Sequence, residues 1–405
     1  MKPFFRPPLS FGIGLVPILL AIFAFNLGSA AWSAIVAERL TQEGAGTGVL
    51  GVLYAICEVS RLPAALLLPA LTVNHGARRI TQVGLVTILA LPLISIGGLH
   101  NPQMMAIFVL SALPAMAVYV GVPALVIGAS REGRDGWSLA WLGLAGGAGG
   151  ALGPTIGGFL ADAYGVGPVL GLFALGTALM LPIATFGKLP PRTAWPGWTS
   201  LAGRGLPWQA LLALGLASAA DAGRAALVPG ELVHQGEPLS SAGMLLTAGA
   251  AVAGIGFLGF GRMADRQSPR RVLGMGVMVL VFGCFASAFA VGFAPAFVVA
   301  SSTLGMGASG IRLGAELALM AWMGRDRMAV VAALAETTVL GGRAVGAPAA
   351  GSIGDAYGGA YAFGAIGTAV VLITGVLMVW TFLKLRRTLA EAAPVVAAIP
   401  VSISE

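Results

Sequence analysis

The chain has 405 residues, of which 57% are hydrophobic and only 10% are charged. A soluble domain carries about 25% charged residues, so this composition excludes an ordinary soluble protein and indicates an integral membrane protein. The 23 Lys and Arg residues outnumber the 16 Asp and Glu residues. Their distribution, described below, accounts for this basic excess without a nucleic-acid partner.

Long apolar segments follow one another along the chain. A helix needs about 20 apolar residues to cross a bilayer, and twelve segments reach that length. The sequence therefore predicts an all-α integral membrane protein with twelve transmembrane helices. The segments are 12–37, 46–71, 80–99, 104–129, 137–161, 167–187, 208–229, 242–262, 272–292, 295–322, 329–353 and 360–383.

The basic residues between these segments alternate in density. With a cytoplasmic N-terminus, 18 of the 23 Lys and Arg residues fall in the tails and loops on the cytoplasmic side, and only Arg39 falls on the opposite side. Cytoplasmic loops of membrane proteins are enriched in Lys and Arg. We therefore expect a multi-pass protein of a bacterial-type cytoplasmic (inner) membrane, with both termini in the cytoplasm.

Two short sequences recur at nearly the same offset. GRD occurs at 133–135 and 324–326, and DAYG occurs at 162–165 and 355–358. Both pairs relate the fifth segment to the eleventh, which predicts two parallel six-helix halves with pseudo-symmetry. The predicted divisions are an N-terminal half (1–187), a proline- and glycine-rich cytoplasmic linker (188–207), a C-terminal half (208–387) and a tail (388–405).

Eight ionisable residues lie inside the expected spans. They form four pairs, one after another along the chain, and the spacing within each pair places both members on one helix face. A charge at the bilayer centre costs about 2.5–3.5 kcal/mol on insertion scales, so these side chains must be paired, hydrated or both. The residues are Glu58, Arg61, Asp221, Arg224, Arg312, Glu316, Glu336 and Arg343.

The third, sixth, ninth and twelfth spans contain no charge, so we expect those helices to face lipid and the charged helices to line a polar cavity. Two interpretations of the charges stay open. They are structural ion pairs that hold helices together, or they handle a substrate or protons. Glu316 is the first candidate proton carrier, with Arg312 setting its proton affinity. Asp221 and Glu336 follow, and then Glu58.

A glycine-rich motif, GGALGPTIGGFL, occupies residues 149–160 of the fifth span. Glycines four residues apart make a flat helix face, and proline bends a helix. The chain resembles the major facilitator superfamily over essentially its whole length, and this segment resembles the family's fifth-helix antiporter motif. The resemblance implies an exporter, chiefly a drug–proton antiporter, whereas generic packing of small residues is the alternative. The matching residues are Gly149, Gly153, Pro154, Gly157 and Gly158.

A second motif, GRMADRQSPRR at 261–271, resembles the family's cytoplasmic loop signature. The usual place of that signature is the loop after the second span, where this chain has Val73 at the aspartate position. The resemblance therefore implies a gating motif that is kept in the second half and eroded in the first. The matching residues are Gly261, Asp265, Arg266 and Arg270.

Many proton-coupled members of the family carry an arginine in the fourth span, but residues 113–126 here contain no charge. Its repeat counterpart, the tenth span, carries Arg312 and Glu316 instead. Either the coupling site lies in the second half, or proton coupling is absent. Two short segments, 54–66 and 217–233, are similar to the sugar-efflux branch of the family.

The sequence and the resemblance together predict a secondary active transporter that exports a small organic solute, drug-like or sugar, by alternating access coupled to protons. Import or facilitated diffusion on the same fold, and a non-transporting sensor or scaffold, are the alternatives. No nucleophile–base pair or metal-ligand spacing is visible in the sequence, so we expect neither an enzyme nor a cofactor or metal. The expected partners are the lipid bilayer, a small-molecule substrate and protons, and we expect a monomer that binds no nucleic acid.

Overall fold

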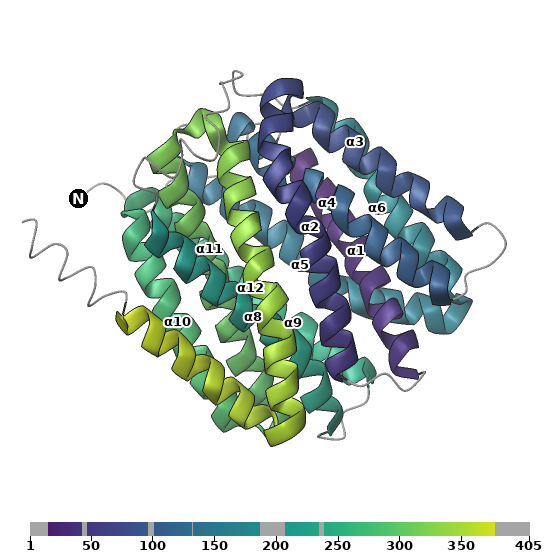
Figure 1. The fold of residues 1–405 in the computed structure, drawn as a ribbon, viewed down its shortest axis with the longest axis vertical. Helices are drawn as coiled ribbons and strands as arrows, with labels where there is room; N and C mark the ends of the chain where they lie inside the picture. Colours follow the sequence, from purple (N-terminus) through teal and green to yellow (C-terminus); the bar gives the residue numbers. More distant parts are fainter. Residues whose placement is uncertain are drawn as a thin grey trace, which may run out of the picture.

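The computed structural model describes residues 15–42, 47–95, 101–131, 133–186, 207–234 and 239–376. These residues form twelve helices and two short 3₁₀ turns (Figure 1). Almost all of the predicted linker 188–207, and all of the predicted tail 388–405, lie outside the described residues. The predicted domain boundaries therefore stay predictions.

Each predicted span overlaps one of the described helices. The first six are α1 (Leu15–Gln42), α2 (Thr47–His75), α3 (Ala77–Ala90), α4 (Asn101–Ala129), α5 (Asp135–Tyr164) and α6 (Val166–Phe186). The other six are α8 (Trp208–His234), α9 (Leu239–Arg266), α10 (Pro269–Ala290), α11 (Ala294–Met323), α12 (Met328–Tyr357) and a last helix over Gly359–Val376. The 3₁₀ turns are η1 (Leu91–Ser95) and η2 (Arg325–Arg327).

The third helix is shorter than the span predicted for it. The sequence predicts helix over 80–99, whereas α3 ends at Ala90 and the chain continues as the 3₁₀ turn η1. Pro92 is the second residue of this turn, and a proline has no N–H to donate and its ring crowds the preceding helical turn. The hydropathy pattern continues through this point because leucine and isoleucine suit either conformation.

Nine of the described helices are long and apolar enough to cross a membrane, and α6 contains a shorter apolar segment, Val166–Pro182. The helices α5 and α9 do not meet this criterion, and these two pack against each other across the molecule. The chain is a multi-pass membrane protein. Surface that faces another helix can be built from glycine and alanine, so α5 and α9 need fewer large apolar side chains than lipid-facing helices.

The two sets of helices repeat one packing scheme. In the first set α1 packs along α5 and α3 packs on α4; in the second set α8 packs along α12 and α10 packs on α11. Figure 1 shows the first set, purple to teal, on one side and the second, green to yellow, on the other. The contacts α2–α12 and α5–α9 join the two sets.

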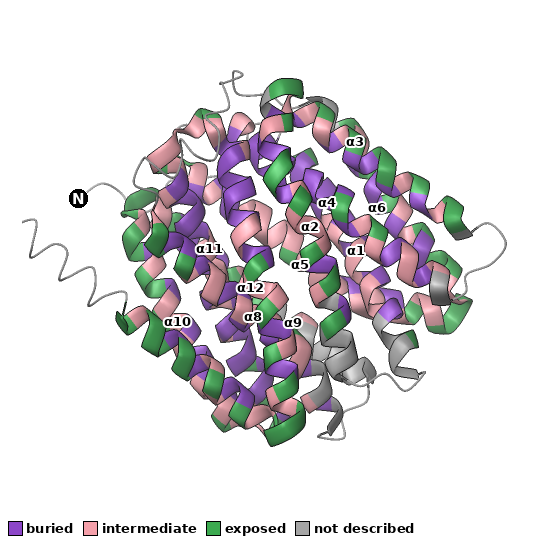
Figure 2. Cartoon of the chain, in the orientation of Figure 1, coloured by how far each residue is buried: buried purple, intermediate pink, exposed green. Residues whose placement is uncertain are grey.

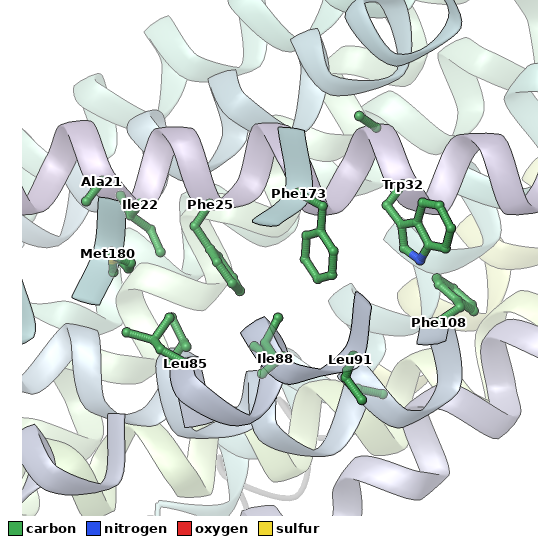
Figure 3. Close-up of a cluster of buried hydrophobic side chains, with 14 of the residues drawn as sticks. Ala21, Ile22, Phe25, Trp32, Leu85, Ile88, Leu91, Phe108, Phe173 and Met180 are labelled. Carbon is green, nitrogen blue, oxygen red and sulfur yellow. The ribbon is translucent and has the colours of Figure 1, made fainter. Parts of the chain in front are cut away.

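Large side chains fill the space between α1, α3, α4 and α6. Phe25 and Trp32 of α1, Ile88 of α3 and Phe173 of α6 are each at most 2% exposed and point into one cluster (Figure 3). Buried positions concentrate in the middle of the molecule, while α3 and α10 carry many exposed side chains on their outer sides (Figure 2). This core fixes α1, and α1 in turn supports α5 at the centre of the molecule.

The repeated DAYG sequence is the end of a helix in both places. Gly165 follows α5 with φ 81° and Gly358 follows α12 with φ 89°, and their N–H groups donate to Ala161 O and Gly354 O at 2.9 Å. A positive φ is strained for residues with a side chain, so glycine is the residue that ends a helix in this way. The repeat is thus a structural stop signal placed at the same point in both sets of helices.

Candidate functional site

Helix α11 carries one continuous polar stripe. Ser302, Gly305, Ser309, Arg312 and Glu316 are spaced 3, 4, 3 and 4 residues apart and all line one cavity. This spacing keeps residues on a single helix face, so the other faces of α11 carry no charged side chain. The two charges in this otherwise apolar helix therefore belong to a face turned toward the cavity.

Arg312 is the centre of an ion-paired triad. Its Nε donates to Glu316 Oε1 at 3.0 Å, one turn further along α11, and its Nη2 donates to Glu336 Oε1 on α12. Glu316 and Glu336 are both buried, at 7% and 5% exposure. When all three groups are ionised, the triad carries one excess negative charge.

The other five charges form a second cluster, the arginine-rich network. Glu58 pairs with Arg61 at 3.0 Å within α2, and Asp221 pairs with Arg224 at 2.9 Å within α8. Arg343 of α12 lies between the two pairs, 3.8 Å from Glu58 and 3.7 Å from Asp221. With three arginines and two carboxylates, this network carries one excess positive charge when all are ionised.

The structure gives Glu336 and Arg343 partners that the sequence spacing did not identify. Glu336 and Arg343 share a helix and a face, so the spacing grouped them together. In the structure Glu336 is paired with Arg312, whereas Arg343 lies near the carboxylates of Glu58 and Asp221. The spacing within α12 could not reveal this, because the partners come from α11, α2 and α8. Each of the eight predicted charges has an opposite charge within 4 Å, which offsets the cost of placing it in an apolar segment.

A cavity of about 620 Å³ lies between the two sets of helices. Its lining residues come from α1, α2, α4, α5, α8, α9, α11 and α12. Within the described ranges, none comes from α3, α6, α10 or the last helix, which correspond to the four charge-free spans. Seven of the eight predicted charges line it, and the eighth, Glu58, is ion-paired to the lining residues Arg61 and Arg343.

The cavity has two unlike walls. The first set of helices contributes an apolar and glycine-rich wall that includes Met116, Val122, Gly147 and Gly150, with Arg61 as its charged member. The second set contributes the six other charged lining residues. Further polar groups, which were not predicted from the sequence, come from Asn26, Tyr119, Ser302 and Ser309. The sequence feature that could have identified these residues is an uncharged polar side chain inside an apolar span.

The glycines of α5 fall on two faces with different surroundings. A side chain at Gly149, Gly153 or Gly157 would collide with α1, and at Gly153 its Cβ would lie 2.6 Å from Leu27 O. A Cβ at Gly158 would meet no heavy atom within 4 Å, and Pro154 lines the cavity. The structure thus has a tight contact with α1 at Gly153, whereas Pro154 lies on the cavity face.

The second set shows the equivalent contact between α12 and α8. Gly342 and Gly346 lie 193 residues after Gly149 and Gly153, and a side chain at either position would collide with Gly215 O or Ala219 O. Close approach of two helices needs small residues at the crossing. The glycine spacing is therefore repeated because the helix pair is repeated.

The loop motif at the end of α9 contacts the start of α5. The carboxylate of Asp265 accepts hydrogen bonds from Trp137 N at 3.2 and 3.3 Å, and Gly261 lies so close to Ala140 that a side chain there would collide with it. Arg266 and Arg270 do not share these contacts, and both are exposed. Desolvation raises the pKa of Asp265 to about 6, although hydrogen bonds from the backbone N–H groups of α5 act in the opposite direction.

A second contact between the halves was not predicted from the sequence. Arg325 of η2 donates to Asp135 at 2.9 Å and to the carbonyl oxygens of Ile127 and Ser130 at 3.0 and 2.9 Å. Both charged partners belong to the repeated GRD sequence, the arginine to its second copy and the aspartate to its first. The repeat was visible in the sequence, but the pairing of its two copies depends on the fold.

The C-terminal part of the chain, residues 210–405, matches the family model of the Major Facilitator Superfamily. No curated protein matches the chain. Among solved structures, the chain is similar to the Major Facilitator Superfamily transporter FucP in the outward conformation, with TM-score 0.63 and 16% identity over 89% of this chain and 98% of that chain. It is also similar to the human organic anion transporter MFSD10 (TETRAN), with TM-score 0.68 and 14% identity over 91% and 99% of the two chains.

These similarities agree with the geometry of the site. Two sets of six helices enclose a central polar cavity, and paired charges from both sets meet in it. The chain has the fold of the transporters of the Major Facilitator Superfamily, and its second half carries the sequence pattern of that family.

Proposed function

We infer that this protein is a secondary active transporter that exports a small organic solute from the cell by alternating access, coupled to protons. The observation that carries the proposal is Arg343, which belongs to the second set of helices and lies within 4 Å of Glu58 of the first. Ion pairs between two halves can form in one arrangement of the halves and break in another. A central cavity that contains such pairs suits a solute site in a transporter rather than an enzyme.

The triad around Arg312 supports proton coupling. One guanidinium faces two carboxylates, so uptake of one proton brings the triad to charge balance without leaving Arg312 alone. Glu316 lines the cavity and is our first candidate for the proton carrier. One similar structure is described as a fucose:proton symporter from E. coli and another as an organic anion transporter, so proton coupling and small organic solutes both occur on this fold.

Export is proposed from the glycine motif of α5. Import or facilitated diffusion on the same fold is the alternative, and a non-transporting sensor is the other. We place the protein in a bacterial-type cytoplasmic membrane, as a monomer with both termini in the cytoplasm. A solute screen in cells that lack their own exporters, with and without a protonophore, tests direction and coupling together.

The proton carrier is tested by Glu316→Gln, which removes the titratable group and keeps the shape of the side chain. Because Arg312 keeps Glu336 as its partner, the variant should fold and insert normally. We expect proton-driven efflux to be abolished while substrate binding or exchange stays measurable. Asp326→Asn, an exposed position outside the cavity, is the matched control and should pump normally. Pumping by Glu316→Gln with an unchanged pH dependence would move the assignment to Asp221 and Glu336.

A further inference from the structure

Arg343 is presented to a ligand more openly than its two carboxylate partners. The side chain of Arg343 is 38% exposed, whereas those of Glu58 and Asp221 are 11% and 24% exposed. Arg343 also lies 3.7–3.8 Å from both carboxylates, beyond hydrogen-bond length, so these two contacts leave its N–H donors available. The positive member of the network is therefore the one that a solute meets first.

The net charge of the arginine-rich network also favours an anionic ligand. Glu58 and Asp221 each have a hydrogen-bonded arginine of their own, at 3.0 and 2.9 Å. Arg343 is the additional cation and gives the network its one excess positive charge. Guanidinium groups bind carboxylate, sulfonate and phosphate oxygens through paired hydrogen bonds. An anionic group placed at Arg343 would balance this charge.

The opposite wall suits an apolar body. Gly147 and Gly150 of α5 line the cavity, and a side chain at either position would meet no heavy atom within 4 Å. Leu144 and Ala148 of α5, which are both partly exposed, are also part of the lining. Glycines on a helix face leave a shallow, flat surface, and a cavity of about 620 Å³ is within the range of small-molecule sites.

We propose that the solute of this cavity is an amphiphilic organic anion, with its anionic group at Arg343 and its apolar, flat body against the Gly147–Gly150 face of α5. The proposal rests on the proposed function only in treating this cavity as the solute site. It is tested by equilibrium binding, so that its failure can be distinguished from a failure of transport.

The experiment uses the full-length purified protein and three matched naphthalene probes: naphthalene-1-sulfonate, the neutral naphthalene-1-sulfonamide and the cation of 1-naphthylmethylamine. Methanesulfonate serves as an anion without an apolar body. Binding is measured by calorimetry in the same detergent for all four compounds. We expect the sulfonate to bind at least tenfold more tightly than the other three. Equal or tighter binding of the neutral or cationic probe would overturn the proposal.

Two variants then locate the two parts of the probe. Arg343→Gln should weaken sulfonate binding at least tenfold and leave sulfonamide binding unchanged, with partial recovery in Arg343→Lys. Gly147→Leu should weaken both probes, whereas Gly171→Leu, an equally open glycine on α6 outside the cavity, should weaken neither. Unchanged sulfonate binding in Arg343→Gln would refute the assigned site. Sulfonate that binds as expected but is never transported would leave this inference standing and contradict the proposed function.

Discussion

Arg312 and Arg343 should contribute differently to the free energy of unfolding, although both are ion-paired arginines in the same cavity. Arg312 is the arginine partner of two buried carboxylates, Glu316 and Glu336. Arg343 shares its carboxylates with Arg61 and Arg224. Removal of one member of a buried pair leaves an uncompensated charge, which is costly, whereas removal of a shared member leaves the remaining pairs intact.

The first prediction follows from this difference. Arg312→Gln should lower the free energy of unfolding by about 3–5 kcal/mol, because two buried carboxylates lose their arginine. Arg343→Gln should change it little, because each carboxylate keeps a hydrogen-bonded arginine. Thermal unfolding of both variants in the same detergent measures the effect. Similar losses of Tm in the two variants would contradict this difference between the networks.

Asp265 supplies the second prediction, which concerns pH. Its folded-state pKa is about 6, above the ordinary value of 3.8, so the folded protein binds this proton more tightly than the unfolded chain. By linkage, the stability contribution is fully present below about pH 4 and is lost as the pH rises through about 6.

Asp265→Asn imitates the protonated form and should remove this pH dependence. Wild type and variant should therefore have similar Tm near pH 4, and the variant should become relatively more stable as the pH rises to about 7. The comparison is made by thermal unfolding across this range. A wild type that gains on the variant at higher pH would mean that the backbone N–H groups of α5 stabilise the carboxylate more than burial disfavours it.

At the scale of the element, helix α5 combines two tasks on two faces. Gly149, Gly153 and Gly157 allow α1 to approach, and Gly147 and Gly150 open onto the cavity. The glycine motif alone does not distinguish these faces, because every member looks equally small. The distances to α1 separate Gly149, Gly153 and Gly157, which pack against that helix, from Gly158, where a Cβ would meet no heavy atom within 4 Å.

The third prediction tests that separation. Gly153→Val should leave the protein in the membrane, lower its stability by about 1–3 kcal/mol and stop transport, because the new side chain would overlap Leu27 O and Ala31 N. Gly158→Val adds the same atoms where nothing lies within 4 Å, so it should be close to neutral. Membrane yield, Tm and efflux are measured for both. Normal efflux by Gly153→Val would remove the main argument for an antiporter-type exporter.

At the scale of the whole molecule, contacts of Asp265 and Arg325 join the two sets of helices at one end. The positive-inside pattern predicts that this end faces the cytoplasm. Ser200, in the middle of the predicted linker, would be a natural position to test this topology by cysteine labelling, but it lies outside the described residues. Ser268, exposed between α9 and α10, and Tyr164, exposed at the end of α5, lie within them.

The fourth prediction uses these two exposed positions. In a background without Cys57 and Cys284, which are both buried, Ser268→Cys should react in intact cells only with a membrane-permeant thiol reagent. Tyr164→Cys should react with an impermeant reagent as well. The reverse pattern would invert the topology, and with it the assignment of the Asp265 and Arg325 contacts to the cytoplasmic side.

The number of helices and their approximate positions were predictable from the sequence because a bilayer imposes a length and a hydropathy that each segment must meet alone. The exception, α3, ends early because Pro92 changes the backbone without changing the hydropathy. The eight charges were also identifiable, since a charge in an apolar segment is costly wherever the helix is finally placed.

The sequence by itself thus determined which residues are unusual, and only the tertiary structure decided what each one contacts. Helical spacing placed Arg312 beside Glu316, but the contact with Glu336 required α11 and α12 to be neighbours. The same holds for Arg343 between Glu58 and Asp221, and for Arg325 on Asp135, which are 285, 122 and 190 residues apart. Periodicity describes one helix at a time, whereas these ion pairs depend on how separate helices pack, which is decided by small residues such as Gly153 and Gly346 at the crossings.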